Sequence, residues 1–193
     1  MRRRPARTVT ALLATVVVLA TSAACTTAGV DQTGSNGYVS GDGTITLIAP
    51  ADRKPAPTLQ GDKLGGGTLD TADYAGRTLV LNVWGAWCGE CRGEAKDLVE
   101  ASRQLPDTAF VGIDTRDRDS LALAYVRRFG VPYPSLVDQD SKLLLNFYGV
   151  VAANAIPSTL VIDRAGKLAA VITGPTTTST LVGLVHDIEQ KTG

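Results

Sequence analysis

The chain reads LVLNVWGAWCGEC from Leu79 to Cys91. Its first half is a continuous run of apolar and β-favouring residues, which is typical of a central strand buried on both faces. The turn that follows places Cys88 where a helix should begin, and there free backbone N–H groups and the helix dipole favour a thiolate. Cys91 is close enough along the chain to form a disulfide with Cys88. The pattern predicts a redox-active cysteine pair.

The first 25 of the 193 residues have the features of an export signal. Arginines without any acidic residue precede an apolar stretch over 11–20, which is shorter than the roughly 20 residues of a transmembrane helix. Small residues then lead to Cys25 in an order that resembles a bacterial lipobox, although Ser22 stands where leucine is usual. We expect residues 1–25 to be a lipoprotein signal peptide with Cys25 lipidated; the alternatives are plain secretion and an uncleaved anchor.

A lipid on Cys25 would also explain the odd cysteine, because it leaves Cys88 and Cys91 as an isolated pair. Four of the 19 basic residues lie in the first 25 residues, so the remainder carries 15 basic and 19 acidic side chains. This mildly acidic composition disfavours nucleic-acid binding, which normally needs a basic face.

The chain after the signal divides into a tether and one domain. Residues 26–50 are expected to be a flexible tether, rich in small polar residues over 26–44, with a possible edge strand at 45–48. Residues 51–193 form the domain, and Gly65–Gly67 is expected to be a turn. Periodicity predicts strands at 78–84, 109–114, 135–137, 159–163 and 168–172, and helices at 91–105, 120–129, 141–147 and around 181–188. Alternating strands and helices followed by a hairpin indicate a mixed α/β layer fold.

From about residue 55 to the end, the chain resembles the TlpA/ResA-like branch of membrane-tethered thioredoxin-fold proteins. The resemblance rests on the segments 81–94, 147–150 and 156–163, and on Gly166, which stand in the family's order and spacing. It implies a thioredoxin-like three-layer α/β fold, with a central mixed sheet flanked by helices, and an oxidoreductase that needs no cofactor.

The position of each cysteine implies its role. Cys88 should attack as a thiolate, and Cys91, one turn inside the helix, should resolve the mixed disulfide. Pro157 matches the family's cis-proline, which would leave the backbone of Ile156 free to pair with a substrate strand; the alternative is an ordinary trans turn. Trp87 is expected to form an apolar rim for docking, with Gly89 and Glu90 in the same binding surface.

Three acidic or amide positions bear on proton transfer. Glu94 follows Cys91 by one turn on the same helix face, where apolar surroundings would raise its pKa and let it accept a proton from Cys91. The alternative is a solvated glutamate that complements the helix dipole. Asn82 stands where thioredoxin has a buried acid, which puts more of the proton transfer on Glu94. Glu90 replaces the usual proline, and its charge should raise the pKa of Cys88 and favour a reductant.

Other interpretations of these residues are weaker. A structural disulfide across so few residues would constrain little unfolded-state entropy. A zinc site would have only Cys88, Cys91 and His186 as soft ligands, whereas a structural zinc site needs four ligands. We expect His186 to be exposed and residues 116–119 to form a solvated loop and helix cap.

The sequence therefore predicts an extracytoplasmic, lipid-anchored thiol–disulfide oxidoreductase. By resemblance it would reduce disulfides in exported proteins, such as apocytochrome c, and a CcdA-type membrane protein would return its electrons. The alternatives are a DsbA- or DsbE-like oxidant and a non-catalytic binding lipoprotein. A peroxidase is disfavoured because the usual proline- and threonine-containing approach to the reactive cysteine is missing before Cys88.

Overall fold

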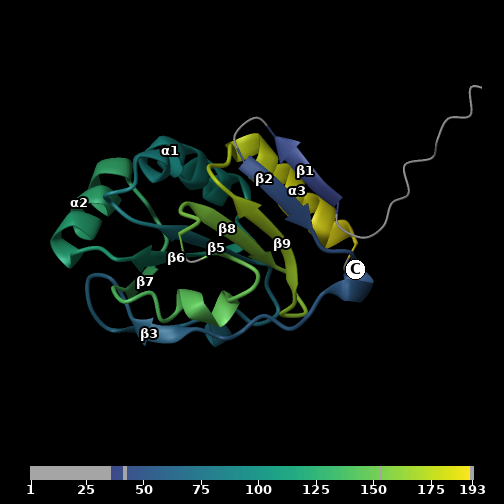
Figure 1. Ribbon diagram of the computed structural model, residues 1–193, viewed down its shortest axis with the longest axis horizontal. Helices are drawn as coiled ribbons and strands as arrows, with labels where there is room; N and C mark the ends of the chain where they lie inside the picture. Colours follow the sequence, from purple (N-terminus) through teal and green to yellow (C-terminus); the bar gives the residue numbers. More distant parts are fainter. Residues whose placement is uncertain (1–35, 41–42, 153, 192–193) are drawn as a thin grey trace, which may run out of the picture. The chain divides into compact units, whose positions relative to one another are not determined.

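A seven-stranded mixed sheet is the centre of the fold (Figure 1). The structure is a computed structural model that describes residues 36–40, 43–152 and 154–191. The expected signal peptide, Cys25 and the first part of the tether therefore lie outside the described residues. The strands run in the spatial order β1-β2-β9-β8-β5-β6-β7. Their bounds are β1 Asn36–Ser40, β2 Gly43–Leu47, β5 Leu79–Trp84, β6 Ala109–Thr115, β7 Ser135–Asp138, β8 Ser158–Ile162 and β9 Leu168–Thr173.

The sheet is mixed because its two halves are connected differently. β5, β6 and β7 pair in parallel, and each step between them crosses over through a helix, as parallel neighbours require. β8 and β9 form the predicted hairpin and pair antiparallel, which places β8 directly beside β5. Every residue of β5 is buried, so the continuous apolar run does mark a strand covered on both faces.

Three α-helices cover one face of the sheet, and short irregular elements cover the other (Figure 1). The helices are α1 Gly89–Gln104, α2 Asp119–Phe129 and α3 Thr178–Gln190. The opposite face packs against the hairpin of β3 Gln60–Asp62 and β4 Thr68–Asp70 and the 3-10 helices η2 Thr71–Tyr74 and η3 Leu144–Phe147. A further 3-10 helix, η1, spans Pro50–Asp52. The expected three-layer α/β fold is confirmed, with one layer built from a short hairpin and 3-10 helices instead of α-helices.

Two expectations about local structure differ from the structure, one of them in part. The strand expected at 45–48 is β2, which begins at Gly43 and lies between β1 and β9 instead of at the sheet edge. Together with β1 it brings residues 36–40 and 43–47 of the expected tether into the sheet, because main-chain pairing needs no apolar side chain on the partner strand. The short helix expected at 141–147 is present only over its last four residues, as the 3-10 helix η3. Asp138 accepts hydrogen bonds from the Leu143 and Leu144 N–H groups, and so a turn precedes the helix.

Candidate active site

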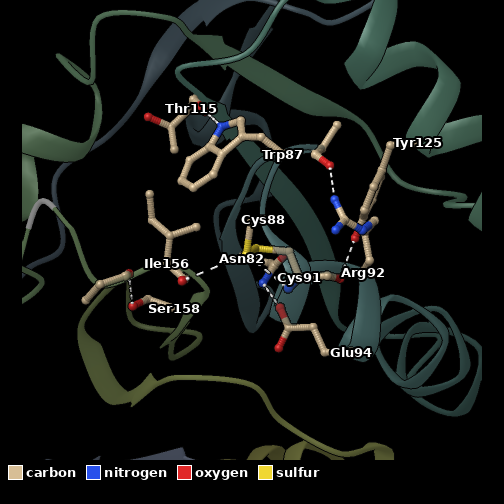
Figure 2. The surroundings of a disulfide bond; sticks show 12 residues. Asn82, Trp87, Cys88, Cys91, Arg92, Glu94, Thr115, Tyr125, Ile156 and Ser158 are labelled. Carbon is tan, nitrogen blue, oxygen red and sulfur yellow. Dashed lines mark hydrogen bonds between the residues drawn. A yellow bond between two sulfur atoms is a disulfide. The ribbon is translucent and has the colours of Figure 1, made fainter.

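The turn between β5 and α1 carries the cysteine pair (Figure 2). Cys88 is the N-cap of α1, and its Sγ accepts a hydrogen bond from the Cys91 N–H at 3.0 Å. Cys88 and Cys91 are joined by a disulfide. Cys88 keeps 5% of its surface exposed, whereas Cys91 is fully buried. The geometry thus gives the two cysteines the unequal access that was predicted for them.

The loop before β8 lies against the disulfide. The Ile156–Pro157 peptide bond is cis, and the Ile156 carbonyl oxygen lies 3.9 Å from Cys88 Sγ. The Ser158 hydroxyl donates to the Ala155 carbonyl at 2.6 Å, which ties the two sides of the proline together. Because β8 pairs with β5 antiparallel, with Ser158 opposite Val83, this loop is brought to the end of β5 where α1 begins.

Glu94 is buried on the sheet side of α1, with only 3% of its surface exposed. Its Oε1 accepts from the Asn82 side-chain amide and its Oε2 from the Thr176 N–H, both at 3.0 Å. Asn82 also donates to the Thr159 hydroxyl at 3.3 Å. We call Asn82, Glu94 and Thr176 the buried network; Figure 2 shows its first two members close to Cys91.

Burial raises the pKa of the Glu94 carboxyl from its ordinary 4.5 to about 7, although the hydrogen bonds from Asn82 and Thr176 oppose the shift. The nearby carboxylates of Asp97 and Glu90 add to the increase. The solvated alternative for Glu94 is therefore wrong. Near neutral pH this carboxyl exchanges its proton readily, one helical turn from Cys91.

The opposite side of the disulfide is open to solvent. Trp87 is 48% exposed, and Glu90 and Gly89 are also exposed. The Trp87 indole N–H donates to the Thr115 carbonyl at 3.1 Å, and the Arg116 guanidinium lies 5.1 Å from the ring centre. We call Trp87, Gly89 and Glu90 the exposed rim. The indole folds back over Gly85, where a Cβ atom would come within 2.5 Å of its nitrogen.

Asp117 was expected in a solvated loop, and this expectation is wrong. Its carboxylate is only 8% exposed and accepts hydrogen bonds from the Ala86 N–H at 2.5 Å and the Arg118 N–H at 2.8 Å. It therefore fixes the turn in front of Cys88. The N-cap of α2 is Arg118, which lies within the residues expected to cap the helix, but its side chain makes no capping hydrogen bond.

The aromatic side chains of Trp84 and Tyr125 pack in the same buried cluster as Cys88 and Cys91. Trp84 is buried, stacks on Tyr125 with ring centres 4.3 Å apart, and donates to the Ser135 hydroxyl at 3.3 Å. The Tyr125 hydroxyl in turn donates to the Cys91 carbonyl at 2.8 Å. Gly112 leaves the space for the Trp84 indole, because a Cβ atom there would collide with the indole nitrogen and with Ser135.

Asp114 is a second buried carboxyl near the site, at the end of β6. It is 1% exposed, and its Oδ1 has no hydrogen-bond partner. Burial, with the neighbouring carboxylates of Asp117 and Asp119, raises its pKa from 3.8 to about 7. Sequence patterning had shown it only as the last residue of a strand.

Sequence reasoning missed Thr176, Asp117, Tyr125 and Asp114 as neighbours of the site. Tyr125 had only a helical apolar period as a signal, and Asp117 stood in a run of alternating charges that is usually solvated.

His186 is exposed, as expected. Residues 36–40, 43–152 and 154–191 contain no group of three or more histidine, cysteine, aspartate or glutamate side chains that is placed to hold a metal ion. No helix of this described part is both long and apolar enough to cross a membrane.

Residues 53–171 match the model of the AhpC/TSA family. The chain is 26% identical over 137 residues to the thiol-disulfide oxidoreductase ResA of Bacillus thuringiensis (strain Al Hakam), covering 70% of this chain and 77% of that protein. It is 33% identical over 132 residues to the thiol:disulfide interchange protein DsbE of Allochromatium vinosum, and the match covers 67% of this chain and 70% of that protein.

Solved structures agree with these relatives. The chain is similar to a DsbF homologue from Corynebacterium diphtheriae, with a TM-score of 0.71 and 32% identity over 80% of this chain and 99% of that one. It is also similar to a secreted thiol-disulfide isomerase from Corynebacterium glutamicum, with a TM-score of 0.70 and 29% identity. That match covers 80% of this chain and 98% of the other one. Together with the disulfide at the start of α1, these matches show that the chain belongs to the thioredoxin-fold AhpC/TSA family and is a thiol–disulfide oxidoreductase of the ResA/DsbE type.

Proposed function

We propose that the protein is a lipid-anchored extracytoplasmic reductase of disulfides in exported proteins. Cys25 would carry the lipid, and haem-attachment cysteines of an apocytochrome c would be one substrate. A CcdA-type membrane protein would supply the electrons. The observation that carries the proposal is the buried Glu94 carboxyl, with a pKa of about 7, one turn from Cys91.

The reaction balances within the two cysteines and one substrate disulfide. In the reduced protein the Cys88 thiolate, favoured by the start of α1, attacks one substrate sulfur, and the other substrate sulfur leaves as a thiolate. Cys91 passes its proton to Glu94 and attacks Cys88 Sγ. The substrate sulfur that was bonded to Cys88 then leaves as a thiolate and takes up the proton that Glu94 accepted. The substrate gains two electrons, and the protein ends with the Cys88–Cys91 disulfide that the structure contains.

The exposed rim and the cis-proline loop would bind the substrate. The Ile156 carbonyl lies beside Cys88 Sγ, so a substrate strand that pairs with it would bring its own sulfur to Cys88. Trp87 and Gly89 would contact the same strand from the other side. Glu90 is exposed between the cysteines, and its charge disfavours the Cys88 thiolate, which makes the disulfide harder to reduce and the protein a better reductant.

The reduction potential of the Cys88–Cys91 pair tests this direction of electron flow. Equilibration of the protein in glutathione or dithiothreitol buffers should give about −270 mV or lower, as for thioredoxin. A potential nearer to about −120 mV would instead identify an oxidant that inserts disulfides. Metabolic labelling with palmitate in cells that express the wild-type protein or Cys25→Ser tests the anchor, since only the wild type should take up label.

A further inference from the structure

An apolar groove lies beside the cysteine turn, between the start of α1 and the helix α2. Its volume is about 210 Å³, and its walls include Trp87, Leu121, Tyr125 and Phe129, with Arg92 and Arg128 at its edge. Leu121 is 47% exposed and Trp87 is 48% exposed, so two large apolar side chains meet water here. Apolar surface of this kind next to a reactive group is typical of a recognition site.

The groove lies away from the cis-proline loop. Figure 2 shows Arg92 and Tyr125 on one side of the disulfide and Ile156 on the other. A bound polypeptide that pairs with Ile156 therefore has a second surface available on the far side of Cys88. Trp87 belongs to both surfaces, since it stands on the exposed rim and also lines the groove.

The edge of the groove is positively charged. Arg92 and Arg128 line the groove, and Arg116 contacts it only through the ring of Trp87. All three arginines are exposed, and among the described residues none of them forms an ion pair with an acidic side chain. Instead, Arg92 donates to the Ala86 carbonyl, Arg116 lies over the Trp87 ring, and Arg128 lies over the Phe129 ring. A guanidinium that lies over a ring, or that donates only one hydrogen bond, keeps N–H groups free to bind a carboxylate.

Among the described residues, no acidic side chain lines the groove, whereas Arg92 and Arg128 do. Asp117 is engaged with two backbone N–H groups, and Asp119 accepts from Gln139. Glu90 is the exposed acid of the cysteine turn. The groove is therefore basic on a protein that is acidic after residue 25, with 15 basic and 19 acidic side chains, so charge complementarity selects an acidic partner.

The groove is also preformed. Tyr125 is fixed on one side by stacking on Trp84 and on the other by its hydrogen bond to the Cys91 carbonyl. Tyr125 and Phe129 pack with ring centres 4.7 Å apart. A partner that enters the groove therefore loses little free energy to ordering its walls.

We propose that this groove binds a segment of the substrate protein in which a large apolar side chain stands next to acidic residues, close to the disulfide that is exchanged. The apolar side chain fills the space between Trp87, Leu121 and Phe129, and the carboxylates pair with Arg92 and Arg128. This inference rests on the proposed exchange function and adds the class of substrate that it prefers.

Two synthetic peptides test the preference. Each contains one intramolecular disulfide followed by leucine and three glutamates, or by leucine and three glutamines in the control. The full-length protein is reduced, and its second-order rate constant with each peptide is followed by tryptophan fluorescence at low salt. The glutamate peptide should react about tenfold faster, and high salt should remove most of the difference.

Three single substitutions test whether the preference for the glutamate peptide arises in the groove. Arg128→Glu should abolish the advantage of the glutamate peptide, and Leu121→Ser should slow both peptides. Lys167→Glu makes the same charge change in the exposed β8–β9 turn, at the end of β8 away from Ser158, and should keep the advantage. The small uncharged 2-hydroxyethyl disulfide does not reach the groove and should react at the same rate with every variant.

Equal rates for the two peptides, or an equal loss in Lys167→Glu, would overturn the groove as an acidic-segment site while leaving exchange itself intact. If the wild-type protein fails to react with the hydroxyethyl disulfide as well, the proposed function is wrong and the inference is lost with it. The reaction with 2-hydroxyethyl disulfide thus distinguishes failure of the acidic-segment site from failure of the proposed function.

Discussion

Cys88 and Cys91 are joined to each other, yet they face two different regions of the molecule. Cys91 is fully buried near the buried network of Asn82, Glu94 and Thr176, where the glutamate carboxylate has hydrogen-bond partners on both oxygens. Cys88 faces the exposed rim, where Trp87 is about half exposed. The difference teaches that exchange needs both environments: an open one that admits a foreign sulfur, and a closed one in which a proton acceptor is kept from water.

The strongest test of this comparison separates the cysteines. Cys91→Ser should trap a covalent mixed disulfide between Cys88 and its substrate, because Cys88, the more accessible of the two cysteines, can attack and nothing resolves the product. Cys88→Ser should trap none, because Cys91 is fully buried. Both variants should lose turnover completely. Non-reducing gels of cells that express each variant give the measurement, and trapping by Cys88→Ser would contradict the assigned roles.

The buried network should control the resolving step. Glu94→Gln keeps the shape but cannot take a proton, so resolution at pH 7 should slow about 100-fold. In the wild type this rate should rise with pH through about 7, where Glu94 loses its proton. In the variant the rise should move to higher pH. Single-turnover kinetics between mildly acidic and alkaline pH would show this shift, and an unchanged pH profile would remove Glu94 from the mechanism.

Stability gives an independent view of the same carboxyl. In the oxidised protein the cysteines do not titrate, and the folded state holds a proton on Glu94 that the unfolded chain loses above 4.5. The free energy of unfolding should therefore fall as pH rises from about 4.5 to about 7, and Glu94 should contribute about 3 kcal/mol to that fall. Urea unfolding of Glu94→Gln at several pH values should show a flatter dependence.

Asp114 supplies the matched comparison. Its pKa is also raised to about 7 by burial, so Asp114→Asn should flatten the pH dependence of stability in the same way. Its carboxylate, unlike that of Glu94, has one oxygen without a hydrogen-bond partner. Asp114→Asn should leave the resolving rate near that of the wild type. If both variants slow exchange equally, burial of charge, and not proton transfer by Glu94, would be the common cause.

The smallest expected effect concerns the turn that joins the two regions. Asp117→Ala leaves the Ala86 and Arg118 N–H groups without their acceptor and should destabilise the fold by about 1–3 kcal/mol. Asp119→Ala is the control, because that exposed carboxylate accepts only from Gln139, and it should change stability by less than about 0.5 kcal/mol. Equal losses in chemical denaturation would mean that Asp117 does not hold the turn.

Sequence patterning predicted the parts of the fold that depend on local order. The apolar run over 79–84 identified a central strand, and the C-x-x-C spacing identified the redox pair. The β8–β9 hairpin and the last helix were also found, because period and turn residues specify them locally. Patterning failed for β1, because its mostly small and polar residues pair with β2 through the main chain. It also failed for the first turn of the helix expected at 141–147, where the Asp138 side chain turns inward, and for Asp117, whose partner Ala86 is distant along the chain.

The sequence by itself determined the chemistry: two cysteines one turn apart at the start of a helix, with a glutamate one turn further. It could not determine whether that glutamate meets water. Only the tertiary structure decided this, by closing β5, α1 and the start of α3 around Glu94 and so raising its pKa to about 7. Burial is a property of packing between distant segments, and a residue's spacing in the chain fixes its helix face but not what covers that face.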